Sequence, residues 1–345
     1  MSLVKKAPTI QDVARFAQVS TATVSRALSM PERVSEDTRR RVSEAVLATG
    51  YTLNQSARSL RQKTARTILV ALPDIRNTFF SNILDAIERE ASARGYGVLV
   101  ANRFSGDDPG QRLRDYFISN RVDGLVLLDG SVDLEQLMIL REAPSPVPLV
   151  VACEEIPDSP FHTVKTDNAY AAERATRHLI ELGHRHIAHL RGPEGNVLTQ
   201  ERQEGYLAAL AQARLPLRLE WLLDGGFAME NGRAAAAAFL ALSERPTAVF
   251  TANDESAIGF LTALRGAGIE CPRDISVVGF DDLALSQHYV PPLTTMRQPC
   301  AAVGRLAAQA LIDVIEGEPR SRVPRRMVLS SDLIIRGSTA PAPFH

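Results

Sequence analysis

The sequence predicts an α/β protein with a small helical module at its N-terminus and a larger body of alternating strands and helices. Helical patterns with one apolar face occupy residues 9–50. From residue 67 onward, short apolar runs alternate with helical stretches, and this alternation occurs twice. A chain of 345 residues suits two or three domains. We therefore expect a headpiece at 1–53, a hinge helix or linker at 54–66 and a core at 67–340.

Two short helices begin the headpiece. Thr9 and Asp12 have the spacing of a capping box at the start of the first helix, and Ser20 is placed to cap the second. Val24 and Leu28 give the second helix an apolar side that can pack on the first. The opposite side carries small, polar and basic residues, namely Thr21, Ala22, Ser25, Arg26 and Ser29. This pattern is typical of a helix-turn-helix, whose second helix can enter a DNA major groove.

A third helix is expected from Ser35 to Gly50. Glu36 and Asp37 lie in its first turn, where the helix dipole favours acidic side chains. Glycine is the residue that most often ends a helix. The three helices would share a small apolar core.

The charge of the chain is divided unevenly. The net charge of -1 conceals 12 Lys and Arg against 5 Asp and Glu in residues 1–66, a net charge of +7, and hence -8 in the rest. A basic module on an acidic body is what phosphate binding by one end requires. A merely solvated basic face would explain the charge alone, but not its coincidence with a helix-turn-helix in the same segment.

The segment at 54–63 is short and polar, and Leu60 is its one large apolar residue. Such a segment cannot hold a helix in isolation, so it is expected to be a linker in the free protein. The functional interpretation is a hinge that becomes helical on DNA. Leu60 would then wedge between base pairs in the minor groove, with Arg58 or Arg61 near phosphate.

The core is expected to form two lobes, each a parallel sheet with helices on both faces. Lobe 1 would comprise residues 67–165 and 296–326, and lobe 2 residues 166–292 and 327–340. Ligands bind such sheets outside the carboxyl ends of the strands, so the cleft between the lobes is the expected ligand site. The expected strands are at 68–72, 98–100, 125–128, 149–152, 187–190, 248–251, 275–280, 327–329 and 333–335. The expected helices are at 79–94, 111–121, 134–142, 169–182, 198–214, 230–243, 254–267 and 301–316.

Several classes of protein are disfavoured. No apolar run is long enough to span a bilayer, no signal-peptide pattern precedes the first helix, and three scattered cysteines suit the cytoplasm. A zinc site is one interpretation of the three neighbouring histidines His184, His186 and His189. We reject it because these residues lead into a strand, where alternate side chains point to opposite faces. No Gly-x-Ser-x-Gly, Walker A or Gly-x-Gly-x-x-Gly motif occurs. We expect no enzyme activity, no catalytic residue, no cofactor and no metal.

These motifs together resemble the LacI family of bacterial transcriptional repressors over nearly the whole chain, and within it the nucleoside-responsive members. The residues that carry the resemblance are at 9–14, 19–28, 34–39, 50–51, 57–60, 278–282 and 292–295. The resemblance implies a three-helix headpiece, a hinge helix and a periplasmic-binding-protein-like core that dimerises. Two positions depart from the family pattern: Ser29 stands where many members have Asn, and Cys153 where relatives often have Asp or Asn.

The resemblance also implies the site residues. Thr21, Ala22 and Arg26 would read bases, with apolar contact from Ala22 to a thymine methyl and pairing of Arg26 with a guanine edge. The DNA-binding set is Thr9, Ser20, Thr21, Ala22, Thr23, Ser25, Arg26, Ser29, Arg33, Asn54, Ala57, Arg58 and Leu60. The effector-binding set is Phe79, Phe80, Cys153, Asn196, Leu198, Arg202, Phe227, Asn253, Asp281 and Gln298. Without the resemblance, Phe79 and Phe80 would be interpreted as ordinary core.

The expected function is a ligand-responsive repressor. A homodimer would bind a near-palindromic double-stranded DNA operator, and a nucleoside or ribose-like sugar in the interlobe cleft would modulate that binding. Arg202 and Asp281 would bond hydroxyl groups, while Phe80 or Phe227 would stack on a ring face. The alternative is a two-lobed solute-binding or nucleoside-processing protein without operator function.

Overall fold

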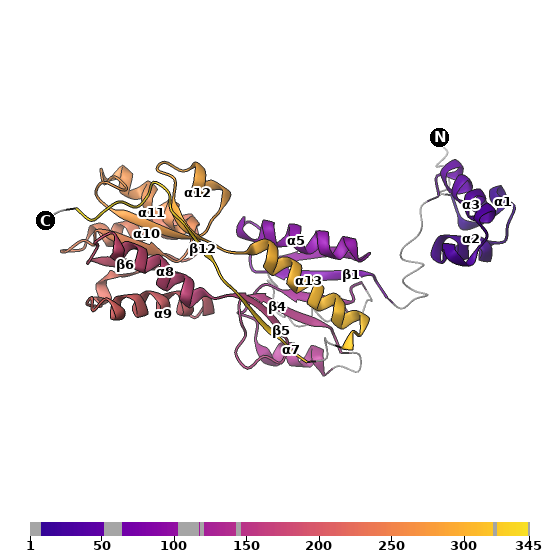
Figure 1. The fold of residues 1–345 in the computed structure, drawn as a ribbon, viewed down its shortest axis with the longest axis horizontal. Coiled ribbons are helices and arrows are strands. Elements are labelled where there is room, and N and C mark those ends of the chain that lie inside the picture. Colours follow the sequence, from indigo (N-terminus) through magenta and orange to yellow (C-terminus); the bar gives the residue numbers. More distant parts are fainter. Residues whose placement is uncertain are drawn as a thin grey trace, which may run out of the picture. The chain divides into compact units, whose positions relative to one another are not determined.

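The computed structural model describes residues 8–51, 64–102, 117, 121–142, 146–319 and 323–343 (Figure 1). The chain divides into two compact units, within residues 1–63 and 64–345. The expected positions Asn54, Ala57, Arg58 and Leu60 lie outside the described residues, as does most of the helix expected at 111–121.

The headpiece contains the three expected helices, α1 (Ile10–Ala17), α2 (Thr21–Ser29) and α3 (Glu36–Thr49). Ser20 and Ser35 cap α2 and α3, and Gly50 ends α3 in the left-handed conformation. A short 3-10 turn, η1 (Pro31–Arg33), connects α2 to α3. The helices bury a small core made of Val13, Ala14, Ala17, Val24, Ala27, Val42 and Ala45.

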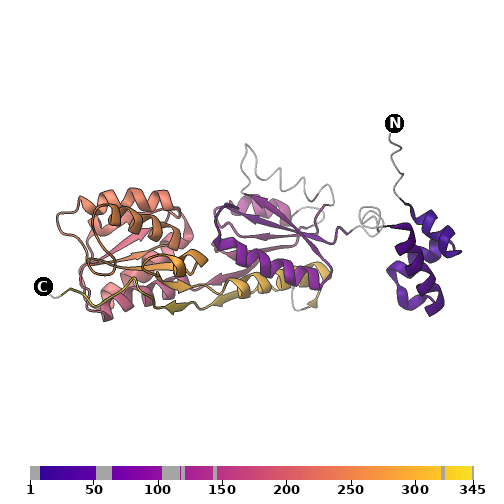
Figure 2. The same ribbon diagram turned by 90° about the horizontal axis from the view of Figure 1, so that it is seen from above.

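Lobe 1 is a six-stranded sheet with the strand order β11-β5-β4-β3-β1-β2, and all its pairs are parallel. Helices α5 and α13 pack side by side against it (Figures 1 and 2). Its strands are β1 (Thr67–Leu72), β2 (Gly97–Asn102), β3 (Gly124–Leu127), β4 (Leu149–Cys153), β5 (His162–Thr166) and β11 (Arg326–Leu329). Its described helices are α5 (Phe79–Ala93), α7 (Leu134–Arg141) and α13 (Cys300–Glu316).

Lobe 2 is a second six-stranded sheet, in the order β12-β10-β9-β8-β6-β7, with only β12 antiparallel among its described pairs. Its strands are β6 (Ile187–Arg191), β7 (Leu222–Asp224), β8 (Ala248–Thr251), β9 (Ser276–Asp281), β10 (Thr294–Arg297) and β12 (Asp332–Ile334). Its helices are α8 (Asn168–Glu181), α9 (Val197–Gln212), α10 (Met229–Leu240), α11 (Asp254–Gly266), α12 (Ala284–His288) and the 3-10 turn η2 (Leu219–Trp221).

The lobe boundaries expected near the C-terminus are wrong in two places. Residues 296–297 belong to β10, which pairs with β9 in lobe 2 rather than with lobe 1. Residues 327–329 belong to β11, which pairs with β5 in lobe 1 rather than with lobe 2. The chain therefore crosses between lobes after β5, after β10 and after β11. A short apolar run predicts a strand, but its pairing partner depends on contacts far away in the chain.

Four further differences concern strands. The run at 98–100 forms β2 but is not buried, because β2 ends the sheet order and leaves Leu99 and Val100 40% and 42% exposed. The sequence does not predict β5, β7 or β10, since polar residues interrupt their apolar pattern.

A helix that spans a membrane must be both long and apolar. None of the described helices is long and apolar enough to cross a membrane.

Candidate functional site

The exposed side of α2 is the candidate DNA-binding surface. Thr21, Ala22, Ser25, Arg26 and Ser29 lie together there, beside Ile10 and Met30, in a shallow groove. Thr21, Ala22, Arg26 and Ser29 are exposed, and Ser25 is partly exposed. The structure therefore gathers on one face the residues that the helical spacing predicts.

Local hydrogen bonds fix the ends of the helix-turn-helix. Ser20 Oγ accepts from the backbone N–H of Thr23 at 3.0 Å and lies 2.8 Å from Thr23 Oγ1. Thr9 donates from its backbone N–H and its hydroxyl to Asp12 Oδ2, at 2.9 and 2.7 Å. These residues are primarily helix caps in this structure, and both Thr9 and Ser20 remain exposed. Arg33 is exposed in η1.

The candidate effector site is a cavity of about 600 Å³ between the two lobes of the core. Eight expected residues line it: Phe79, Phe80, Cys153, Leu198, Arg202, Phe227, Asn253 and Asp281. Eight others that the sequence did not predict also line it: Pro73, Asp74, Arg76, Asn77, Glu154, Pro193, Ala228 and Glu255. The expected residues Asn196 and Gln298 are not part of its lining, but each contacts a carboxylate that is. The cavity volume suits a small organic ligand.

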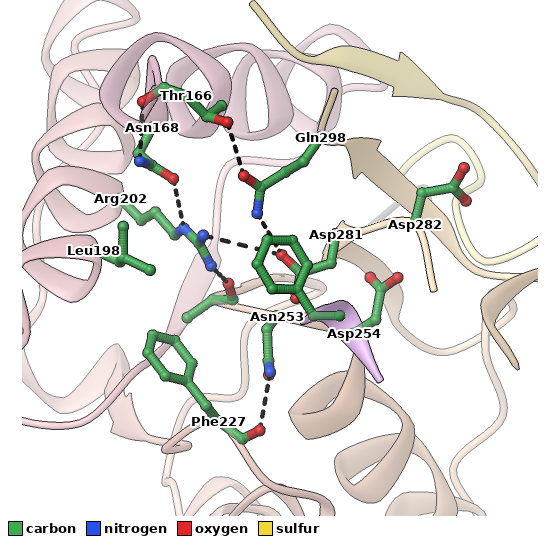
Figure 3. Close-up of polar contacts among 12 residues, drawn as sticks. Thr166, Asn168, Leu198, Arg202, Phe227, Asn253, Asp254, Asp281, Asp282 and Gln298 are labelled. Carbon is green, nitrogen blue, oxygen red and sulfur yellow. Dashed lines mark hydrogen bonds and ion pairs between the residues drawn. The ribbon is translucent and has the colours of Figure 1, made fainter. Parts of the chain in front are cut away.

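Arg202 is the buried cation of this pocket (Figure 3). Its Nε donates to Asn168 Oδ1 at 3.1 Å and its Nη1 to the backbone oxygen of Ala252 at 2.5 Å. Its Nη2 lies 3.9 Å from Asp281 Oδ1, and its Cζ lies 3.8 Å from the centre of the Phe280 ring. Burial lowers the pKa of Arg202, while Asp281 opposes that shift. The guanidinium is held in place from several sides, as a group that orients a ligand should be.

Asp281 ends β9 with a φ of 117° and turns its carboxylate toward Arg202 (Figure 3). Gln298 Nε2 donates to Asp281 Oδ1 at 2.7 Å, and Thr166 Oγ1 donates to Gln298 Oε1 at 2.9 Å. Burial raises the pKa of Asp281 to about 7, although Arg202 pulls it down. Gln298 is therefore a positioning residue behind the pocket rather than part of its wall.

Aromatic rings from both lobes line the pocket. Asn253 caps α11 through the N–H of Ser256 and donates from Nδ2 to the backbone oxygen of Phe227 at 2.9 Å, which fixes the Phe227 loop. Phe79 and Phe80 lie edge to face with ring centres 5.2 Å apart. They belong to the lobe 1 core and line the pocket as well. The pair is therefore core, and the ligand contact that the resemblance implies for it stays a prediction.

Carboxylates outnumber cations in the pocket lining. Asp74, Glu154, Glu255 and Asp281 line it, against Arg76 and Arg202. Arg76 is paired with Asp74 at 2.8 Å. Glu154 is only 6% exposed, and burial raises its pKa to about 7. The signal that could have found Glu154 is its place two residues after the apolar run at 149–152, at the carboxyl end of a parallel strand.

The three histidines occupy separate surroundings. His189 lies between the rings of Tyr206 and Phe250, and burial lowers its pKa to about 4. His184 lies 2.8 Å from Thr247 Oγ1, and His186 lies 3.2 Å from Glu244. Within the described part of the chain, no group of three or more His, Cys, Asp or Glu side chains is arranged to hold a metal ion.

Comparisons with known proteins agree with this architecture. The family model described as bacterial regulatory proteins, lacI family, matches residues 9–54, and a periplasmic binding protein-like domain matches residues 176–339. The repressor CytR of Escherichia coli (strain K12) is 38% identical over 337 residues, which cover 98% of each chain. The repressor PurR of Aliivibrio fischeri (strain MJ11) is 35% identical, covering 96% of this chain and 98% of its own.

Solved structures show the same likeness over nearly the full length. The lac repressor dimer bound to operator and the anti-inducer ONPF matches with a TM-score of 0.85 and 28% identity, over 97% of this chain and 100% of that one. The complex of the transcriptional regulator CelR with cellobiose matches with a TM-score of 0.72 and 33% identity, over 96% and 99% of the two chains.

A helix-turn-helix unit joined to a two-lobed core of this kind defines a class of bacterial transcription regulators. The chain belongs to the LacI family. It is a DNA-binding transcriptional repressor of that type, homologous to CytR and PurR.

Proposed function

We propose that this repressor binds a near-palindromic operator as a homodimer, and that a nucleoside or ribose-like effector in the interlobe pocket modulates its affinity for DNA. The observation that carries the effector class is the buried pair of Arg202 and Asp281 beside the ring of Phe227. A guanidinium and a carboxylate together bond the adjacent hydroxyls of a sugar, and an aromatic ring stacks on a flat ligand.

The proposed effect of the ligand is on the angle between the lobes. The chain crosses between the lobes three times, so the pocket walls can move relative to each other about these crossings. An effector that binds one lobe arrangement better than another shifts the population toward it, by about 1–3 kcal/mol of coupling in typical cases. We propose that this shift acts on the hinge at 54–66, where Leu60 would insert into the minor groove of the operator.

The proposed dimer matches the symmetry of the operator. Two headpieces related by a twofold axis would place two α2 helices in successive major grooves. The apolar side chains of Leu99 and Val100 on the edge strand β2 are 40% and 42% exposed, which supports burial of this edge against a second copy.

Fluorescence anisotropy with the DNA upstream of the gene tests the repressor proposal, with and without candidate effectors. We expect sequence-specific binding that an effector changes, and a weaker complex for Leu60→Ala with unchanged effector affinity. Absence of sequence-specific binding under all conditions would overturn the operator proposal. Equal operator affinity of the Leu60→Ala variant would overturn the hinge mechanism alone.

A thermal-shift screen of nucleosides, purine bases, pentoses and hexoses tests the effector class. Nucleosides or pentoses are expected to raise the Tm, because a ligand that binds only the folded chain stabilises it. Stabilisation only by hexoses or by phosphorylated sugars would show the proposed class to be wrong.

A further inference from the structure

Glu154 is a buried carboxylate in the pocket lining that forms no direct ion pair with a described residue, although the charge of Arg202 acts on it from across the pocket. It is 6% exposed and follows β4 in lobe 1. Its Oε2 accepts from the backbone N–H of Gly130 at 2.9 Å. The amide nitrogen of Asn196, from lobe 2, lies 3.4 Å from each carboxylate oxygen. A buried carboxylate with only neutral donors has unused capacity to accept hydrogen bonds.

Gly130 fixes the orientation of this side chain. A Cβ atom at Gly130 would lie 2.7 Å from Glu154 Cβ and 2.8 Å from its Oε2, so only glycine leaves room for this contact. The Gly130 N–H therefore keeps Oε2 occupied. Oε1 has only the long contact from Asn196 and is the oxygen left for a ligand.

The position of Glu154 relative to Arg202 suits a ligand with two parts. Asn196, which contacts Glu154, caps the N-terminus of α9, and Arg202 lies six residues further along that helix. Six residues of α-helix span about 9 Å. A sugar ring held by Arg202 and Asp281 would leave the region of Glu154 for a second group joined to it.

We propose that Glu154 selects the base of a nucleoside effector by accepting a hydrogen bond from an exocyclic amino group, while Arg202 and Asp281 hold the ribose hydroxyls. This inference rests on the proposed nucleoside effector. An amino group donates where an oxo group can only accept, so a carboxylate oxygen at this place favours the amino compound. The excess of carboxylates over guanidinium groups in the lining also disfavours a phosphate on the ligand.

Isothermal titration calorimetry of the full chain with two matched pairs, cytidine with uridine and adenosine with inosine, tests the inference. In each pair an oxo group replaces the amino group, and the neighbouring ring nitrogen changes from an acceptor to an N–H donor. We expect the wild-type chain to prefer the amino member of the pair that fits the pocket by at least tenfold at pH 8. The corresponding monophosphates are expected to bind more weakly than the nucleosides.

Glu154→Gln gives the decisive comparison. Because the Gly130 N–H retains the amide oxygen, the amide NH₂ would replace Oε1 and present a donor instead of an acceptor. The preference should therefore reverse toward the oxo member. Glu194→Gln is the matched control, since Glu194 is exposed and outside the pocket lining, and it should keep the wild-type preference.

The pH dependence separates recognition from a structural role. The wild-type preference for the amino member should grow from pH 6 to pH 8, as Glu154 loses its proton, and the preference of Glu154→Gln should stay constant. An unchanged preference in a folded Glu154→Gln chain would overturn the role of Glu154 and leave the nucleoside proposal standing. Equal affinity of the wild-type chain for the amino and the oxo member of a pair would also overturn the role of Glu154 and leave the nucleoside proposal standing. Absence of binding by every nucleoside would overturn the nucleoside part of the proposed effector class and this inference with it.

Discussion

Lys165 of β5 in lobe 1 donates a hydrogen bond to the carboxylate of Glu201 on α9 in lobe 2. The same ammonium group donates to Glu155 Oε2 at 2.8 Å, and its side chain is only 5% exposed. Glu201 Oε2 accepts from Asn168 Nδ2 at 3.0 Å, and Asn168 in turn accepts from Arg202. A continuous chain of polar contacts therefore joins the first crossing between the lobes to the buried cation of the candidate effector site.

Replacing Lys165 with Met should destabilise the chain strongly. Glu155 and Glu201 would lose a buried cation, and breaking one side of a buried ion pair typically costs about 3–5 kcal/mol. Urea unfolding at pH 7 measures the loss. Arg326→Met is the control: Arg326 also pairs with Glu155, but its side chain is 60% exposed, so that loss should be about 1 kcal/mol or less. Equal losses of stability for the two variants would show that Lys165 does not act as a buried ion-pair partner between the lobes.

Replacing Phe227 with Ala should weaken effector binding while leaving the fold intact. Its ring lines the pocket, and its backbone oxygen, which holds Asn253, is retained in the variant. Loss of stacking on a base typically costs about 1–3 kcal/mol, or roughly 5- to 150-fold in Kd. Calorimetry with the best nucleoside measures this change. Phe16→Ala, at a headpiece residue that is 61% exposed, should leave effector affinity unchanged. A Kd for Phe227→Ala within twofold of wild type would remove Phe227 from the ligand site.

The stability of the ligand-free chain should fall as pH rises, on account of Glu154. Burial raises its pKa from 4.5 to about 7, so between these values the folded chain holds a proton that the unfolded chain has released. Its contribution is therefore fully present below about pH 4.5 and is lost as pH rises through about 7. Asp281 acts in the same direction, since burial raises its pKa to about 7.

Glu154→Gln should remove this contribution and flatten the profile. Urea unfolding measures the free energy of unfolding of the variant and of wild type. The value for the variant, relative to that for wild type, should be higher at pH 8 than at pH 5. Glu194→Gln, at an exposed carboxylate, should differ from wild type equally at both pH values. A stability difference for Glu154→Gln that is the same at pH 5 and pH 8 would contradict this assignment.

The fold was largely predictable because its signals are local. Caps such as Ser20 and Ser35 and apolar runs such as 149–152 act over a few residues, and the elements they predict are present. Strand pairing is not local, so the sequence places residues 296–297 of β10 and residues 327–329 of β11 in the wrong lobes. Eight of the ten pocket residues implied by family resemblance line one cavity. Glu154 and Glu255 are not among the predicted residues, because a carboxylate near the end of an apolar run does not by itself indicate a ligand site. Its function depends on which donors the fold places beside it, such as Gly130.

Replacing Arg26 with Ala should weaken operator binding and relax sequence preference at one base position. Arg26 is exposed in the groove on α2, within reach of a base edge in the proposed complex. Loss of one bidentate contact to guanine costs about 1–3 kcal/mol. Anisotropy titrations against single-base operator variants measure both effects. Arg40→Ala is the control, because Arg40 lies on α3 and pairs with Asp37 and Glu44. A uniform loss across all operator variants would indicate a phosphate contact instead.

Replacing Gly205 with Ala should disturb both stability and effector binding. Helices α8 and α9 pack closely at this point, and a Cβ atom at Gly205 would lie 2.0 Å from the backbone oxygen of Ala169 and 2.8 Å from the backbone nitrogen of Glu173. Backbone atoms inside a helix cannot move aside cheaply, so the two helices must separate, and overpacking of this kind costs about 1–3 kcal/mol or more. Because α9 carries Arg202, the separation would also displace the guanidinium from Asp281.

Gly266→Ala is the matched control for this substitution. Gly266 is the last residue of α11, and a Cβ atom there would meet nothing within 4 Å. Alanine should therefore stabilise the chain by about 0.4–1 kcal/mol, because it reduces the freedom of the unfolded chain without strain in the folded one. Thermal unfolding should show that Gly205→Ala lowers the stability of the chain and that Gly266→Ala raises it. Calorimetry should show a weaker effector complex for Gly205→Ala only. If Gly205→Ala lowered stability but left effector affinity unchanged, the position of Arg202 would not depend on the packing of α9 against α8.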